Sequence, residues 1–196
     1  MPTSSTPRVV RKNKPKKKYN LSNYRSALPL LLEDFKDRCA YSLMHVKMVS
    51  ERGMHIDHFD PRQKNRSPYS NLFPAYGICN MAKGESWPTA KERRQGMRFL
   101  NPCEEKDYDQ VIFEEPSTHL LIGTTPAARY HIDMLDLNNP SLVEHRLERT
   151  KLAEIANKMV VAGSRALADT AGALEIIGQL QKIIATKIPP IQPLAA

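Results

Sequence analysis

Apolar side chains recur along the chain at two spacings, one typical of helices and one typical of short strands. Between residues 23 and 37 the apolar positions fall three or four apart, which predicts a helix with Pro29 in its first turn. These positions are Leu28, Leu31, Leu32 and Phe35. Residues 39–46 predict a strand or a tight knuckle, and residues 54–59 predict a second strand.

A polar stretch and a short helix follow the second strand. Residues 60–70 predict a loop, because Pro, Asn, Ser and charged side chains are concentrated there. Residues 72–83 are expected to start irregularly and to end in a short helix that carries Asn80 and Lys83. The predicted order is therefore strand, strand, loop, helix.

The second half of the chain predicts a β-hairpin and several helices. The pattern predicts, in order, a helix over 90–97, a hairpin over 110–123, a helix over 126–137, a longer helix from Asn139 that Gly163 ends, and a last helix from Ser164 to Ile184. The whole chain is thus expected to be an α+β protein in three parts. These are a basic disordered tail over 1–22, a core over 23–90, and a hairpin with a helical extension over 91–196 that can dock a partner.

The positive charge of the chain is concentrated at its N-terminal end. Residues 1–32 carry eight basic side chains and no acidic one, and eight is also the net charge of the whole chain. The remaining residues carry 21 basic and 21 acidic side chains. Lys12, Lys16 and Lys17 are therefore candidate contacts to the phosphates of a nucleic acid, with a purely solubilising leader as the alternative.

Composition excludes several other classes of protein. No apolar run reaches the roughly 18–20 residues that a membrane span needs, and the polar start does not resemble a signal peptide. Three unevenly spaced cysteines, at positions 39, 79 and 103, do not make a disulfide framework. A reducing cytoplasm is the expected compartment.

Candidate chemistry lies between residues 55 and 83. His58 is a candidate general base, because an imidazole with a pKa near 6.5 suits proton abstraction around neutral pH. Asp57 offers a carboxylate oxygen, and Asn80 an amide oxygen, to a hard divalent cation such as Mg²⁺ or Mn²⁺. Two protein ligands leave coordination positions open for water and phosphate oxygens.

Three further side chains have supporting roles in this interpretation. Asn71, which follows His58 by 13 positions, is expected to hold the His58 ring or its backbone in place. Lys83 follows Asn80 by three positions, which places it on the same helix face, where it can contact a scissile phosphate. His55 is a candidate substrate contact, with a third metal ligand or a structural role as alternatives.

The ordered pattern resembles the HNH endonuclease motif in its His-Asn-Asn variant. The residues that carry the resemblance are Cys39-Ala-Tyr, Asp57-His58-Phe-Asp-Pro61, Tyr69-Ser-Asn71-Leu, and Cys79-Asn80-Met-Ala-Lys83-Gly84. The resemblance implies a ββα-metal core and metal-dependent hydrolysis of phosphodiester bonds in DNA, with RNA as the other candidate substrate. Later patterns extend it to about residue 150 and are similar to the HNH component of bacterial Septu-type antiphage systems, which also accompanies some retrons.

That subfamily implies an ABC or SMC-like ATPase partner. Many HNH proteins also hold a structural zinc ion with two Cys-x-x-Cys pairs, but each pair here keeps a single cysteine, Cys39 or Cys79. We therefore expect no structural zinc and two buried thiols close together. Two other functions remain open: a non-catalytic nucleic-acid-binding or adaptor subunit that keeps the HNH fold, and a toxin-like nuclease that its partner holds silent.

Overall fold

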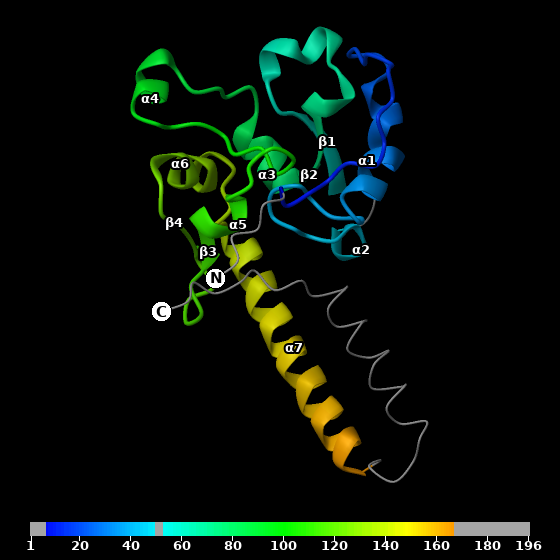
Figure 1. Cartoon of the computed structure of the whole chain (residues 1–196), viewed down its shortest axis with the longest axis vertical. Coiled ribbons are helices and arrows are strands. Elements are labelled where there is room, and N and C mark those ends of the chain that lie inside the picture. The colour runs from blue at the N-terminus through cyan, green and yellow to red at the C-terminus, as the bar shows by residue number, and fades with distance from the viewer. Residues whose placement is uncertain (1–6, 50–52, 167–196) are drawn as a thin grey trace. The chain divides into compact units, whose positions relative to one another are not determined.

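A computed structural model of the chain describes residues 7–49 and 53–166 (Figure 1). Short helices alternate with two small sheets, which confirms the predicted α+β class. The elements are η1 (Tyr24–Ala27), α1 (Leu28–Asp34), α2 (Val46–Val49), β1 (Met54–His58), η3 (Pro61–Arg66), η4 (Tyr69–Asn71), β2 (Leu72–Tyr76), α3 (Gly77–Lys83), α4 (Ala90–Arg94), α5 (Tyr108–Val111), β3 (Ile112–Glu114), β4 (Leu121–Gly123), α6 (Pro126–Met134) and α7 (Pro140–Ala166).

The described residues divide into two compact units. One unit comprises residues 7–113 and 121–139, and the other comprises residues 114–120 and 140–166. The predicted boundary near residue 90 stays a prediction. Among the described residues, no helix has the length and apolar character that crossing a membrane requires.

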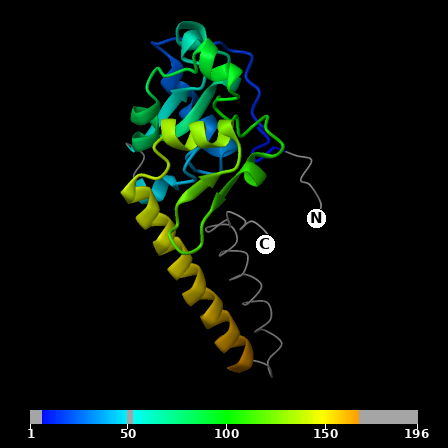
Figure 2. The same ribbon diagram turned by 90° about the vertical axis from the view of Figure 1, so that its left-hand side faces the viewer.

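Strands β1 and β2 form an antiparallel pair at the centre of the first unit (Figures 1 and 2). Asp57 lies opposite Phe73, and His58 lies opposite Leu72. Helix α3 begins directly after β2 and contacts both strands. The observed order is therefore strand, loop, strand, helix. The prediction that both strands precede the loop is wrong.

Two segments near the pair differ from their predicted structure. Residues 61–66, expected as an irregular loop, form the 3₁₀ helix η3, which Asp60 caps by accepting the amide hydrogen of Arg62. Residues 72–76, expected to be irregular, form β2 despite Pro74 at its centre. A two-stranded sheet has only edge strands, so the missing amide hydrogen of Pro74 is tolerated. The carbonyl of Pro74 accepts from the amide of Ala40 at 2.7 Å.

Residues 38–45 form the predicted knuckle. Arg38 and His45 make an isolated antiparallel bridge. The Cys39 sulfur accepts from the amides of Tyr41 and Ser42, both at 3.4 Å. These bonds bring Cys39 and Tyr41 into the buried interior.

The basic N-terminal segment lies on the first unit. Arg11 donates to the carbonyls of Tyr69 at 3.1 Å and Leu72 at 2.8 Å, and its guanidinium lies 4.6 Å from the centre of the Phe73 ring. Asp34 accepts the backbone amide of Lys12 at 2.9 Å. Arg11 thus contacts two carbonyls and one aromatic ring of the first unit. These contacts of a charged side chain fix the backbone on either side of Arg11.

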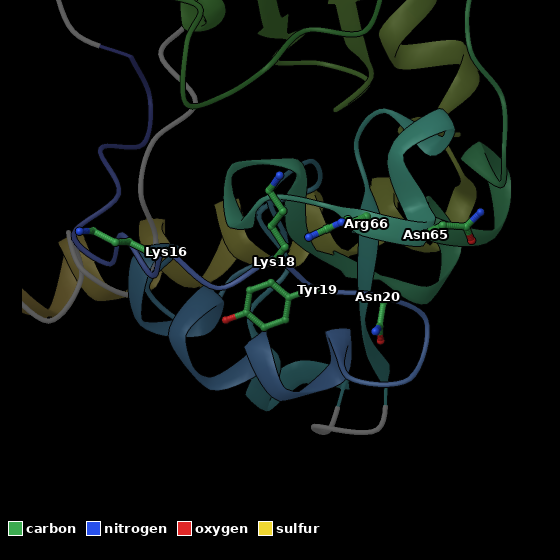
Figure 3. A pocket seen from close by; sticks show the side chains of 6 residues that line it. All are labelled: Lys16, Lys18, Tyr19, Asn20, Asn65 and Arg66. Carbon is green, nitrogen blue, oxygen red and sulfur yellow. The ribbon is translucent and has the colours of Figure 1, made fainter.

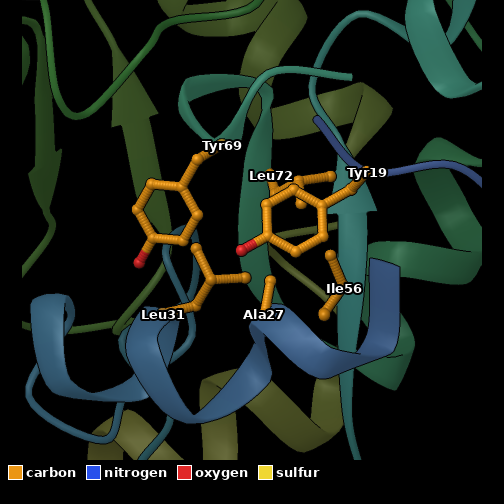
Figure 4. Packing of buried hydrophobic residues seen from close by; sticks show 6 residues of the cluster. All are labelled: Tyr19, Ala27, Leu31, Ile56, Tyr69 and Leu72. Atoms are coloured by element: carbon orange, nitrogen blue, oxygen red, sulfur yellow. The ribbon is translucent and has the colours of Figure 1, made fainter. Parts of the chain in front are cut away.

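Tyr19 anchors the same segment a second time. Its amide donates to the Ser67 carbonyl at 2.8 Å, and the Ser67 amide donates back at 2.7 Å. The Tyr19 ring is buried in an apolar cluster with Ala27, Leu31, Ile56, Tyr69 and Leu72 (Figure 4). The prediction of a disordered tail over 1–22 is therefore wrong for residues 7–22. Residues 1–6 lie outside the described part.

His131 has a structural role in the first unit. Its Nδ1 accepts the amide hydrogen of Leu100 at 3.1 Å, so the ring proton lies on Nε2, which is 2.8 Å from the Tyr108 hydroxyl. Burial lowers the pKa of His131 to about 3. The imidazole is therefore neutral and serves as a buried hydrogen-bonding group.

The second unit is organised around a buried carboxylate. Glu114 pairs with Arg149 of α7 and lies 2.7 Å from His119 Nδ1.

Helix α7 runs through Gly163, so the predicted break there is wrong; glycine weakens a helix by only about 1 kcal/mol. Helix α7 exposes the apolar side chains Leu152, Ile155 and Met159. The predicted last helix, apart from its first residues in α7, lies outside the described part.

Candidate active site

The end of β1 and helix α3 form two walls of a pocket of about 280 Å³. The residues that line it are Leu21, Tyr24, Ile56, Asp57, His58, Pro61, Lys64, Asn80, Gly84 and Glu85. Asp57, His58 and Asn80 were singled out by sequence alone, and the fold brings all three to this pocket. The strand-to-helix connection explains this, because α3 packs across β1 as well as β2.

His58 lies at the last position of β1, half-buried in the pocket wall. Its ring centre is 5.1 Å from the centre of the Tyr24 ring. Burial lowers the pKa of His58 below 6.5, and the ammonium groups of Lys83 and Lys64 lower it further, against the opposing effect of Asp57. The imidazole is therefore neutral at pH 7 and able to accept a proton.

One atom of His58 stands out. Its Nε2 is buried, and among the described residues it is the only buried side-chain nitrogen or oxygen without a hydrogen-bond partner. Buried polar atoms without partners are rare, and a catalytic role or a bound water or ion is among the explanations for such an atom.

Asp57 is almost completely buried and is held by two side chains. Its Oδ2 accepts from the Tyr41 hydroxyl at 2.5 Å, and its Oδ1 lies 2.9 Å from Lys83 Nζ. Tyr41 comes from the knuckle and Lys83 from α3, so one carboxylate joins three segments. Burial, followed by the Asp57 charge, raises the pKa of Tyr41 well above its usual value, which keeps its hydroxyl protonated as the donor.

The ammonium group of Lys83 does not have the position that the sequence predicted, at a scissile phosphate. Its side chain is fully buried, and Nζ donates to Asp57 and, at 2.9 Å, to the backbone carbonyl of His58. It does not line the pocket. Lys83 therefore fixes the two residues at the end of β1, and in this conformation it does not reach a phosphate bound in the pocket.

The donor atoms of Asp57 and Asn80 suit a hard divalent cation. Each carboxylate oxygen has two acceptor positions, and Tyr41 and Lys83 use one on each oxygen, so one remains on each. Asn80 is half-buried in the pocket wall and adds an amide oxygen. Within the described residues, no group of three or more His, Cys, Asp or Glu side chains is arranged to hold a metal. A cation here would need water or phosphate oxygens as its other ligands.

Asn71 holds the backbone that follows His58, as its predicted role requires. Its Oδ1 accepts from the Asp60 amide at 2.8 Å, and its Nδ2 donates to the Asp60 carbonyl at 3.1 Å and to the Ser67 hydroxyl at 3.2 Å. Its own carbonyl accepts from the Phe59 amide at 2.9 Å. Asn71 thus acts on the backbone and makes no bond to the His58 ring.

The remaining predicted contacts lie outside this pocket. His55 is exposed on β1 beside Gly77, and Lys12, Lys16 and Lys17 are exposed on the N-terminal segment. The sequence analysis missed Tyr24, Tyr41 and Lys64. Tyr41 stands within the Cys39-Ala-Tyr pattern, so a signal for it was present. Tyr24 and Lys64 carried none.

Cys39 of the knuckle and Cys79 of α3 lie close together. Both are buried free thiols, as expected, and the Cys79 thiol donates to the Cys39 sulfur. Burial alone would raise the pKa of Cys39, but this bond and those from Ser42 outweigh it and lower the pKa to about 6. The absence of structural zinc stays a prediction.

No protein-family model, curated protein or solved structure matches this chain.

Proposed function

We propose that this chain is a metal-dependent endonuclease of the HNH type, with β1, β2 and α3 as its ββα-metal core. One observation carries the proposal: Asp57, His58 and Asn80 line a single pocket although they come from two elements. A neutral base beside two oxygen ligands is the set that phosphodiester hydrolysis needs.

His58 is the general base in this proposal. Its imidazole accepts the proton of the attacking water, and the lowered pKa keeps it in the accepting form at neutral pH. Asn71 fixes the backbone after His58, and Lys83 fixes the carbonyl of His58, so two side chains hold the backbone on the C-terminal side of the ring. Both are positioning residues.

Asp57 and Asn80 are the residues that would hold Mg²⁺ or Mn²⁺. Such a cation, when bound, supplies Lewis acidity toward a phosphate oxygen and the leaving 3′-oxygen. Lys83 and Tyr41 orient the Asp57 carboxylate, which is how ligands of catalytic metals are commonly fixed. The proposed substrate is DNA, with RNA as the second candidate.

A non-catalytic nucleic-acid-binding subunit is the competing function. The Asp57–Lys83 ion pair favours it, because a buried ammonium 2.9 Å from the carboxylate disfavours a second cation there. The similarity to Septu-type components also leads us to propose an ATPase as partner. The exposed apolar side chains of α7 are candidates for that contact.

The deciding experiment incubates the purified protein with plasmid DNA or total RNA in Mg²⁺, Mn²⁺ or EDTA. Cleavage is expected with either metal, none with EDTA, and none for His58→Ala. His55→Ala changes an exposed imidazole of the same strand and is expected to retain cleavage.

Inactivity of the wild type, both alone and with the product of the neighbouring gene, would favour the binding function. Cleavage that appears only with that product would support the ATPase proposal. Toxicity of the chain expressed alone, relieved by His58→Ala, would indicate a nuclease that its partner silences.

A further inference from the structure

A second, larger pocket of about 690 Å³ lies between the N-terminal segment and the end of η3 (Figure 3). The side chains that line it are Lys16, Lys18, Tyr19, Asn20, Asn65 and Arg66. Three of the six are cationic, two are amides, and none is acidic. In Figure 3, Lys18 and Arg66 lie between Lys16 on one side and Asn65 on the other.

The backbone pairing of Tyr19 with Ser67 builds this pocket. Both residues are buried, and both form an extended bridge. In extended chain, neighbouring side chains point to opposite sides, so Lys18 and Asn20 point away from the core where Tyr19 points into it. Arg66, the last residue of η3, is exposed next to buried Ser67. The positive charges are thus held on two fixed segments.

The same two segments continue into the candidate active site. Leu21 and Tyr24, which line the His58 pocket, follow Asn20 along the N-terminal segment. Lys64, which also lines that pocket, directly precedes Asn65 in η3. On both segments, residues of one pocket are thus sequence neighbours of residues of the other. The basic pocket offers lysine, arginine and amide donors near the candidate active site. Such donors suit a polyanion with regularly spaced charges.

We infer that the pocket of Lys16, Lys18 and Arg66 binds backbone phosphates of the nucleic-acid strand whose cleavage is proposed at His58. That phosphates bind in this pocket is inferred from its basic side chains. That they belong to the strand cleaved at His58 rests on the proposed function. It replaces Lys12 and Lys17 as phosphate contacts, because neither lines the pocket. Asn20 and Asn65 add hydrogen bonds to phosphate or sugar oxygens.

Fluorescence anisotropy of a labelled single-stranded DNA 20-mer, in EDTA to prevent metal-dependent cleavage, tests the inference on the full chain. The test variant is Lys16→Ala/Lys18→Ala/Arg66→Ala. The binding constant falls as salt rises, and each phosphate contact contributes about 0.7 to the steepness of log binding constant against log salt concentration. Losing one contact therefore weakens binding about fivefold at 0.1 M salt. The triple variant is therefore expected to bind about 100-fold more weakly, with a slope lower by about 2.

A matched triple variant removes the same charge elsewhere. Lys12→Ala/Lys14→Ala/Lys91→Ala changes three exposed side chains that do not line the pocket, so its affinity is expected to stay within about threefold of wild type. Thermal unfolding checks that both triple variants fold. A matching RNA 20-mer, run in parallel, identifies which nucleic acid binds more tightly.

Each outcome bears on the pocket separately from catalysis. Equal loss in both triple variants, no loss in the pocket variant, or no binding by the wild type would each overturn the inference. Pocket-dependent binding without cleavage under any condition would support the inference and contradict the proposed nuclease. Cleavage by the wild type, together with unchanged binding in the pocket variant, would support the proposed nuclease and contradict the inference.

Discussion

Replacing Lys83 by methionine separates its structural role from the catalytic role that the sequence suggested. Methionine keeps the length and apolar stem of the side chain and removes the ammonium. At 2.9 Å and an effective dielectric constant near 20, the attraction between Lys83 and Asp57 is about 6 kcal/mol before desolvation is subtracted. The variant leaves the Asp57 carboxylate buried without its cation, and such losses destabilise proteins by about 3–5 kcal/mol.

Denaturant unfolding in EDTA measures this loss without interference from bound metal. We expect the free energy of unfolding to fall by about 3–5 kcal/mol and the melting temperature to fall by about 6–20 °C. The double variant Asp57→Asn/Lys83→Met removes both charges, so it is expected to recover more than half of the loss.

Together with the single variant Asp57→Asn, these proteins complete a double-mutant cycle, which isolates the pairwise interaction. A coupling energy near zero would refute the reasoning, because it would mean that the ion pair does not form in solution. A Lys83→Met protein with wild-type stability but no cleavage would instead place the ammonium at the phosphate, as the sequence suggested.

Four further predictions concern the pocket and the first unit around it. Asn71→Ala removes three buried hydrogen bonds and is expected to lower the free energy of unfolding by about 3 kcal/mol, measured by urea titration; a loss below 1 kcal/mol would contradict the role assigned to it. Arg11→Met is expected to cost about 2–4 kcal/mol in the same assay, whereas Lys14→Met, at an exposed position, should cost less than about 0.5. An NMR titration should give His58 a pKa below 6.5, since burial disfavours its charged form, and the acid limb of any cleavage profile should fall at the same pH. Lys64→Ala removes a neighbouring positive charge and should raise that pKa; an unchanged or lower value would contradict the assigned cause.

The sequence pattern predicted the candidate site better than it predicted the surrounding elements. The spacing from Asp57 to Asn80 indicated one site, and the fold brings Asp57, His58 and Asn80 to one pocket. Strand β2 was missed because Pro74 at its centre argues against a strand, and only its pairing with β1 overcomes that tendency.

Two other features depend on partners that local sequence does not reveal. The Lys-rich and Pro-rich composition of the N-terminal segment predicted disorder, but two single residues, Arg11 and Tyr19, fasten it to the first unit. Helical spacing predicted that Lys83 lies on the same helix face as Asn80. The buried Asp57 carboxylate, 26 positions earlier in sequence, draws its ammonium inward instead.

The long reach of the N-terminal contacts also has a consequence for the order of assembly during synthesis. Arg11 bonds to a carbonyl 61 positions later, and Arg8 pairs with Asp109, 101 positions later. Contacts between such distant residues form slowly and only after the later partner has been made. The contact of Arg8 therefore forms late, because a half-made chain on the ribosome contains the motif residues and Leu72 but not Asp109.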